Sequence, residues 1–310
     1  MNNKLRDFGK VLILVPVVLL FIVAGCKSGA KNEKASKEAG DEFVASDLDV
    51  DTQEKFQTAK RIFYSLPSPI ETAKLLQNAG AKYNEALLNP TENNTEYVTN
   101  LSLALNLGIY TTDLSYASLF DQTQVTLNYI EVAKNMADGL NILDAINETT
   151  IQDLEENINN REKIVDIISE TLMNSSSYLK DRGLESTATL ILVGGWIEGL
   201  YIATQLVGEG SINNNKIVER IVDQKLSVDF MITLLEEAED DPDAVKVLAD
   251  IKALKNVFDK IVINQGENTP VTDPESGITT LKSNSSHNLN QVVFDELLAK
   301  VNELRTGYIS

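Results

Sequence analysis

The chain has 310 residues, of which 43% are hydrophobic, and its formal net charge is −19 at pH 7. Such an acidic protein repels phosphate groups, which argues against nucleic acid as a partner. Because it has one histidine and one cysteine, it cannot build the usual zinc sites, a two-histidine di-iron bundle, a Ser-His-Asp triad or an intramolecular disulfide. No nucleotide-binding glycine motif opens a helix after a strand, so we expect no cofactor.

The N-terminus predicts export. Residues 1–10 carry three cations and one acid, and residues 11–25 are uncharged. The uncharged run is shorter than the about 20 residues of a membrane span and is typical of a signal-peptide core. It ends in Val23-Ala24-Gly25-Cys26, which resembles the lipobox of bacterial lipoproteins. The resemblance implies cleavage before Cys26 and lipid on its sulfur, whereas the alternative is an uncut signal anchor with an incidental cysteine.

The residues after Cys26 indicate in which membrane the chain is anchored and how the domain is attached. Several acyl chains give a stable membrane anchor. Lys27 replaces the aspartate that retains lipoproteins in the inner membrane of enteric bacteria, which favours the outer membrane, with the domain in the periplasm or at the cell surface. Residues 27–50 are small, polar and charged and predict a flexible tether. The predicted organisation is therefore a signal peptide (1–25), a lipidated cysteine with its tether (26–50) and a globular domain (51–310).

Helical patterns dominate this domain. They include a capping box at Ser68-Pro69-Ile70-Glu71, a cap at Asp241-Pro242 and a helix-ending glycine at Gly183. Further caps are predicted at Asp121, at Thr149 and at Asn213 or Asn214. The predicted helices cover about 52–64, 68–83, 92–120, 121–139, 149–180, 187–208, 214–239, 242–261 and 288–305, with a turn-rich loop over 264–286.

Two of these helices show a buried stripe at spacings of three and four residues. The stripes are Leu103, Leu107, Tyr110, Leu114 and Ala117 in the first, and Val247, Ile251, Leu254, Phe258 and Ile261 in the second. The short connections predict an all-α domain of about nine helices, as a multi-helix bundle or as stacked antiparallel hairpins.

Residues 187–208 form the most apolar stretch after the signal peptide. A transmembrane span is one interpretation, but Glu198 at its centre would cost several kcal/mol in hydrocarbon, and the lipid anchor makes a second attachment redundant. We therefore expect a central buried helix. Gly195, Gly199 and Ala203 recur every four residues and predict a closely packed neighbouring helix.

Glu198 is the first candidate site residue, since it shares a helical face with Gly194, Gly195 and Tyr201. A carboxylate beside a phenol can bind a ligand or act as an acid. The structural alternative is a buried carboxylate that is hydrogen-bonded by a tyrosine, an arginine or a helix end and has no further role.

Asp113 is the second candidate, because Asn106, Tyr110 and Asp113 lie on one helical face with Tyr116 three residues further on. The face predicts either a polar pocket or an internal hydrogen-bond network that fixes helix register. If Asp113 and Glu198 converge, the pair has the chemistry of a general acid and base. Arg161 is a candidate cation partner for either acid.

An acidic run over 236–243 lacks the spacing of a calcium-binding loop. It predicts a solvated turn with good helix capping rather than a metal site.

Three segments, which start at Tyr64, Leu105 and Gly194 and include Leu105-Asn-Leu-Gly-Ile-Tyr-Thr-Thr-Asp113, resemble a group of uncharacterised helical lipoproteins of Bacteroidetes-type bacteria. The resemblance implies location and fold only. We expect a non-catalytic lipoprotein that binds an envelope protein or a small ligand. The alternatives are an enzyme or small-ligand receptor that uses Asp113 and Glu198 with the nearby tyrosines, and a purely structural envelope protein.

Overall fold

The structure is a computed structural model of the chain. It describes residues 82–145, 148–160, 163–164, 166–168, 170–171, 179, 182–207, 212–264, 266, 269–272, 279–282 and 286–310. Cys26, the signal peptide, the tether, Arg161 and the helix predicted over 52–64 lie outside these residues, as does all but the end of the helix predicted over 68–83.

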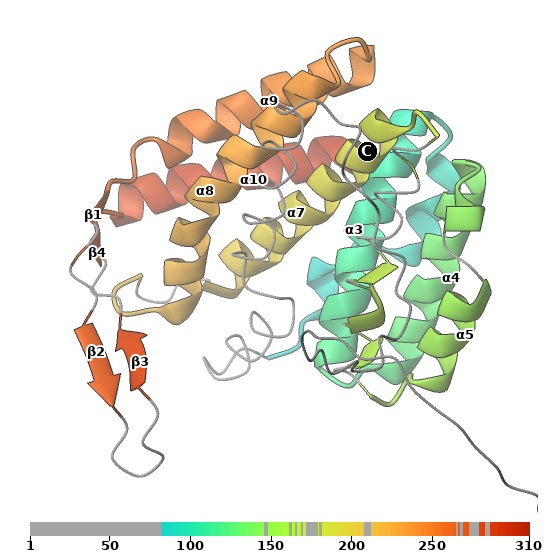
Figure 1. The fold of residues 1–310 in the computed structure, drawn as a ribbon, viewed down its shortest axis with the longest axis horizontal. Coiled ribbons are helices and arrows are strands. Elements are labelled where there is room, and N and C mark those ends of the chain that lie inside the picture. The colour runs from blue at the N-terminus through green and yellow to red at the C-terminus, as the bar shows by residue number, and fades with distance from the viewer. Residues whose placement is uncertain are drawn as a thin grey trace, which may run out of the picture. The chain divides into compact units, whose positions relative to one another are not determined.

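Helices make up most of the regular structure in these ranges, which confirms the predicted all-α class (Figure 1). The α-helices are α3 (Asn100–Leu119), α4 (Thr123–Gly139), α5 (Glu148–Glu156), α7 (Glu185–Val207), α8 (Lys216–Glu237), α9 (Pro242–Phe258) and α10 (Gln291–Tyr308). Short 3-10 helices are η2 (Glu85–Leu87), η3 (Thr91–Glu96) and η4 (Leu143–Ala145).

The region predicted as a turn-rich loop contains two short antiparallel strand pairs, which corrects that prediction. β1 (Ile263–Asn264) pairs with β4 (Ser286–His287), and β2 (Thr269–Thr272) pairs with β3 (Thr279–Lys282). Strands of two to four residues leave no sequence alternation long enough to recognise.

Several helix boundaries differ from those predicted. The helix predicted from Glu92 begins only at Asn100, because a capping box between Thr99 and Ser102 starts it there. The helix predicted from Thr149 to about Lys180 is interrupted after Glu156 by the asparagine-rich turn over 157–160. Residues 163–164, 166–168, 170–171 and 179 are helical again, as predicted.

Three predicted caps are also displaced along the chain. Thr149 lies inside α5, which begins at Glu148. Asp121 adopts a positive φ of 58°, and Gln122 takes the cap position of α4. Asn214 has a φ of 56°, and the neighbouring Asn215 caps α8. In contrast, Asp241 caps α9 as predicted, and Gly183 has the positive φ expected of a helix-ending glycine.

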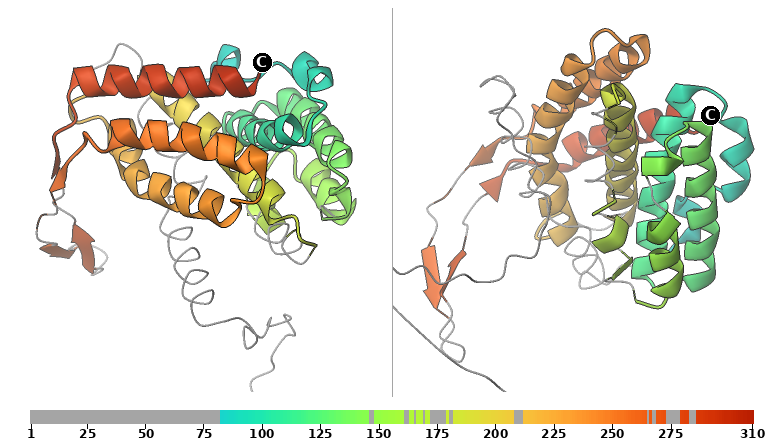
Figure 2. Two further views of the ribbon diagram at one scale, coloured as in Figure 1. Left: turned by 90° about the horizontal axis from the view of Figure 1, so that it is seen from above. Right: turned by 45° about the vertical axis from the view of Figure 1, so that its right-hand side comes forward.

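The two predicted apolar stripes are confirmed, since all ten of their residues are buried. The helices that carry them lie in different parts of the domain. α3 packs between α4 and α7, whereas α7 also contacts α8, α9 and α10 (Figure 2). α3 and α7 therefore form the central pair, which α4, α8 and α10 contact directly.

Glycine allows the backbones of α3 and α7 to meet. A Cβ added at Gly108 would lie 2.0 Å from the carbonyl oxygen of Ile191, and one at Gly194 would lie 2.1 Å from that of Leu105. The predicted close approach is thus confirmed, but Gly194 rather than Gly199 is its tightest point on α7. At Gly199 an added Cβ would come only within 3.9 Å of a neighbouring side chain.

α7 is long and apolar enough to cross a membrane by length and composition alone. In the folded domain, 56% of its most apolar window is buried, and it packs against α3, α8 and α10. This packing favours its interpretation as the central helix of the domain.

Candidate functional site

Asp113 of α3, Glu198 of α7 and Arg305 of α10 meet in the core, and we call these three residues the carboxyl cluster. The Arg305 guanidinium donates to both Glu198 oxygens, with Nε 3.1 Å from Oε2 and the terminal nitrogen 3.3 Å from Oε1. Asp113 and Glu198 are each 0% exposed, and Arg305 is 8% exposed. Residues far apart in the sequence thus form a buried ion pair with a second carboxyl group beside it.

The Asp113 and Glu198 carboxyl groups lie close enough for each to affect the protonation of the other. Burial, together with the negative charge of Glu198, raises the pKa of Asp113 well above its usual range. Burial also raises the pKa of Glu198, while Arg305 opposes that shift. Of the two carboxyl groups, Asp113 therefore keeps a proton more readily, and Glu198, which is paired with Arg305, carries the negative charge more readily.

The hydrogen bonds at Asp113 agree with this assignment. Its Oδ2 accepts from the backbone N–H of Asn89 at 3.0 Å. No N–H or O–H donor of the described residues reaches Oδ1, which suits an oxygen that carries the proton itself.

Residues 84–97, which we call the cover segment, close over the cluster. Arg305 donates to the carbonyl oxygen of Leu87 at 3.1 Å, and Tyr129 donates to that of Asn89 at 2.8 Å. The Asn89 side chain is 0% exposed and donates to Asn106. The segment is held by buried polar contacts, and these contacts also keep water from the two carboxyl groups.

The three tyrosines expected at the site have different roles. Tyr110 is 0% exposed and donates to the carbonyl oxygen of Pro90 at 2.8 Å. The Tyr116 hydroxyl accepts from the backbone N–H of Asn84 at 3.1 Å, so both hold the cover segment. The Tyr201 ring lies under Arg305, whose guanidinium carbon is 4.5 Å from the ring centroid.

The cation at the cluster is Arg305, which the sequence analysis did not select. The sequence pattern around Arg305 gives a weak indication of this role. Arg305 lies between the buried residues Leu304 and Tyr308 of an amphipathic helix, a position where a cation calls for a buried acid partner.

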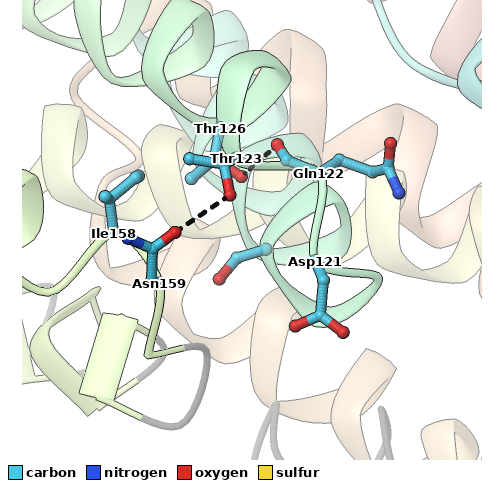
Figure 3. A pocket seen from close by; sticks show the side chains of 7 residues that line it. Asp121, Gln122, Thr123, Thr126, Ile158 and Asn159 are labelled. Atoms are coloured by element: carbon cyan, nitrogen blue, oxygen red, sulfur yellow. Dashed lines mark hydrogen bonds between the residues drawn. The ribbon is translucent and has the colours of Figure 1, made fainter.

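A second feature is a small polar pocket where α3 turns into α4, which we call the α3–α4 pocket (Figure 3). It has a volume of about 140 Å³. Its lining residues are Ser118, Asp121, Gln122, Thr123, Thr126, Ile158 and Asn159. None of the predicted site residues lines it.

Within the described ranges, no group of three or more histidine, cysteine, aspartate or glutamate side chains is arranged to hold a metal ion. In the acidic run over 236–243, Asp241 accepts a hydrogen bond from the backbone N–H of Asp243 at 2.9 Å, and Glu236 pairs with Lys252 at 2.7 Å. These contacts are those of a capped, solvated turn.

Comparison with known protein families, curated proteins and solved structures gave no match.

Proposed function

We propose that this chain is a lipid-anchored protein of the bacterial cell envelope that acts by binding and not by catalysis. The anchoring part of the proposal is supported by the charged N-terminus, the uncharged run over 11–25 and the motif that ends at Cys26. We place the anchor in the outer membrane, with the domain in the periplasm or at the cell surface.

The non-catalytic part of the proposal is supported chiefly by the complete burial of the carboxyl cluster. Asp113 and Glu198 are both 0% exposed, and Glu198 uses both oxygens to bind Arg305. A general acid or base has to come within hydrogen-bond distance of its substrate. The cover segment contacts the cluster through the Asn89 N–H and the Leu87 carbonyl oxygen, and this arrangement supports a structural role for the cluster.

Anchoring is tested by labelling cells with a fatty acid and separating detergent and aqueous phases. The wild-type chain is expected to carry label and enter the detergent phase, whereas Cys26→Ser is expected to carry none and keep its signal peptide. Ser28→Ala, two residues away, is the control and is expected to behave as wild type. Equal labelling of Cys26→Ser and wild type would refute anchoring at this residue.

The binding role is tested by crosslinking in native cells, followed by purification of the lipidated chain and native mass spectrometry. A stoichiometric protein partner would support an envelope-assembly role. A bound small molecule without a protein partner would support a ligand-binding role. A chain that carries neither would contradict the binding proposal.

An enzyme that uses Asp113 and Glu198 is the second candidate, because the two carboxyl groups converge and burial raises the pKa of both. Catalysis would require the cover segment to open. In that case Asp113→Asn would abolish a hydrolytic activity of the purified chain while its melting temperature stayed close to wild type. If Asp113→Asn lowered the melting temperature together with the activity, the cluster would have a structural role.

A further inference from the structure

The cover segment is attached to the domain mainly by polar contacts. Over residues 84–97 the buried apolar side chains are Leu88 and Tyr97, and the 3-10 helices η2 and η3 contain no buried residue. A hydrogen bond contributes less net free energy to folding than a buried large apolar side chain does. The cover segment is therefore expected to open more easily than the helices of the core, where apolar contacts dominate.

Two hydrogen bonds join the cover segment directly to the C-terminal end of α10. Arg305 donates to the carbonyl oxygen of Leu87 at 3.1 Å, and the Tyr97 hydroxyl donates to the carbonyl oxygen of Ile309 at 3.3 Å. The last carbonyl groups of a helix have no partner within the helix. Tyr97 therefore supplies a donor that the end of α10 needs.

Asn89 and Asn106 connect the same two parts of the chain inside the core. Asn89 donates to the Tyr97 hydroxyl at 3.0 Å and to the side-chain oxygen of Asn106 at 3.1 Å. Asn106 in turn donates to the carbonyl oxygen of Tyr308 at 2.8 Å. Both asparagines are 0% exposed, so water cannot replace one partner while the others stay in place. The network is therefore expected to break as a whole.

We propose that the cover segment and residues 306–309 at the end of α10 form one strap, which opens as a unit while α3 stays packed against α7. Opening uncovers the carboxyl cluster, because the Asn89 N–H and the Leu87 carbonyl oxygen contact Asp113 and Arg305 in the closed state. The strap thus controls the access of solvent to the buried acids. This device goes beyond the proposed binding role and does not depend on lipid anchoring.

Hydrogen exchange of the full lipidated chain in detergent micelles, followed by mass spectrometry of its peptides, measures this opening. In wild type, the cover segment and residues 306–309 are expected to share one opening equilibrium and to exchange faster than α7, after correction for intrinsic rates. α7 is the reference because it lies at the centre of the packed helices and exposes its amides only when the domain unfolds.

Two variants loosen the strap from the side that does not touch α10. The Tyr110 hydroxyl donates to the carbonyl oxygen of Pro90, and the Tyr129 hydroxyl donates to that of Asn89. Tyr110→Phe and Tyr129→Phe keep the buried rings and each remove one of these bonds. Each is expected to speed exchange about threefold to tenfold in both parts of the strap, including the end of α10.

Tyr201→Phe is the matched control. It keeps the ring that lies under Arg305 and removes a hydroxyl that makes none of the strap's hydrogen bonds. Both parts of the strap are expected to exchange as in wild type.

Two results would overturn the proposal. Unchanged exchange of residues 306–309 in Tyr110→Phe and Tyr129→Phe would mean that the end of α10 frays by itself. Exchange of the cover segment as slow as that of α7 in wild type would mean that the segment opens only when the whole domain unfolds.

Discussion

Asp113 is the residue whose chemistry has the most direct consequence for stability. Its raised pKa means that the folded chain keeps a proton that the unfolded chain releases near pH 4. Between these two pKa values the folded state binds more protons, so stability falls as pH rises through that window. We expect Asp113→Asn to remove the fall in the free energy of unfolding that Asp113 causes as pH rises. Urea unfolding at a series of pH values measures it.

The control for this measurement is Asp223→Asn, because the Asp223 side chain is 50% exposed and pairs with Arg220 on the surface. It is expected to keep the wild-type pH dependence. If Asp113→Asn follows the same pH dependence as wild type, Asp113 does not hold the extra proton.

At the scale of single residues, the sequence predicted two of the three residues of the carboxyl cluster. Glu198 in an apolar helix and Asp113 among buried positions were both recognisable, because charges at such positions need partners. The partner itself was not predictable. Arg305 lies 107 residues from Glu198, and the pairing depends on how α7 and α10 cross, which no local pattern specifies.

At the scale of elements, the contact between α3 and α7 depends on glycine. Gly194→Ala and Gly108→Ala would each push a methyl group against a backbone carbonyl of the other helix. Since neither backbone can move without displacing its helix, we expect each to lower the free energy of unfolding by about 1–3 kcal/mol or more. Urea unfolding of the purified variants measures this loss.

Gly199→Ala is the matched control on the same helix, since an added Cβ there meets only ordinary contact at 3.9 Å. It is expected to be neutral or to stabilise the domain by up to about 1 kcal/mol through helix propensity. Equal losses at Gly194 and Gly199 would show that the close approach is not the cause.

The helices themselves were largely predictable, because α3 and α9 carry apolar stripes and the turn at Asp241 carries a recognisable cap. The errors arose where local chemistry competes with that pattern. Thr99 and Ser102 start α3 eight residues later than its hydrophobic pattern indicated, and the asparagines over 157–160 follow the early end of α5. The strand pairs between α9 and α10 were missed because they are too short to show alternation.

At the scale of the whole molecule, the sequence predicted an all-α domain but not which helices pack together. The placement of α3 between α4 and α7 follows from side-chain fit across the core, which emerges only in three dimensions. The α3–α4 pocket was likewise not predictable, since Ile158 and Asn159 join it from a turn that the sequence analysis placed inside a helix.

The central claim is that the carboxyl cluster stabilises the fold and does not perform chemistry. Its most direct test is urea unfolding of Arg305→Met, Glu198→Met and the double variant. We predict that Arg305→Met lowers the free energy of unfolding by about 3–5 kcal/mol, because it leaves the Glu198 charge buried and unpaired. The double variant is predicted to recover much of this free energy, because it removes both charges. Functional sites often gain stability when their residues are replaced, so single variants at least as stable as wild type would contradict the claim.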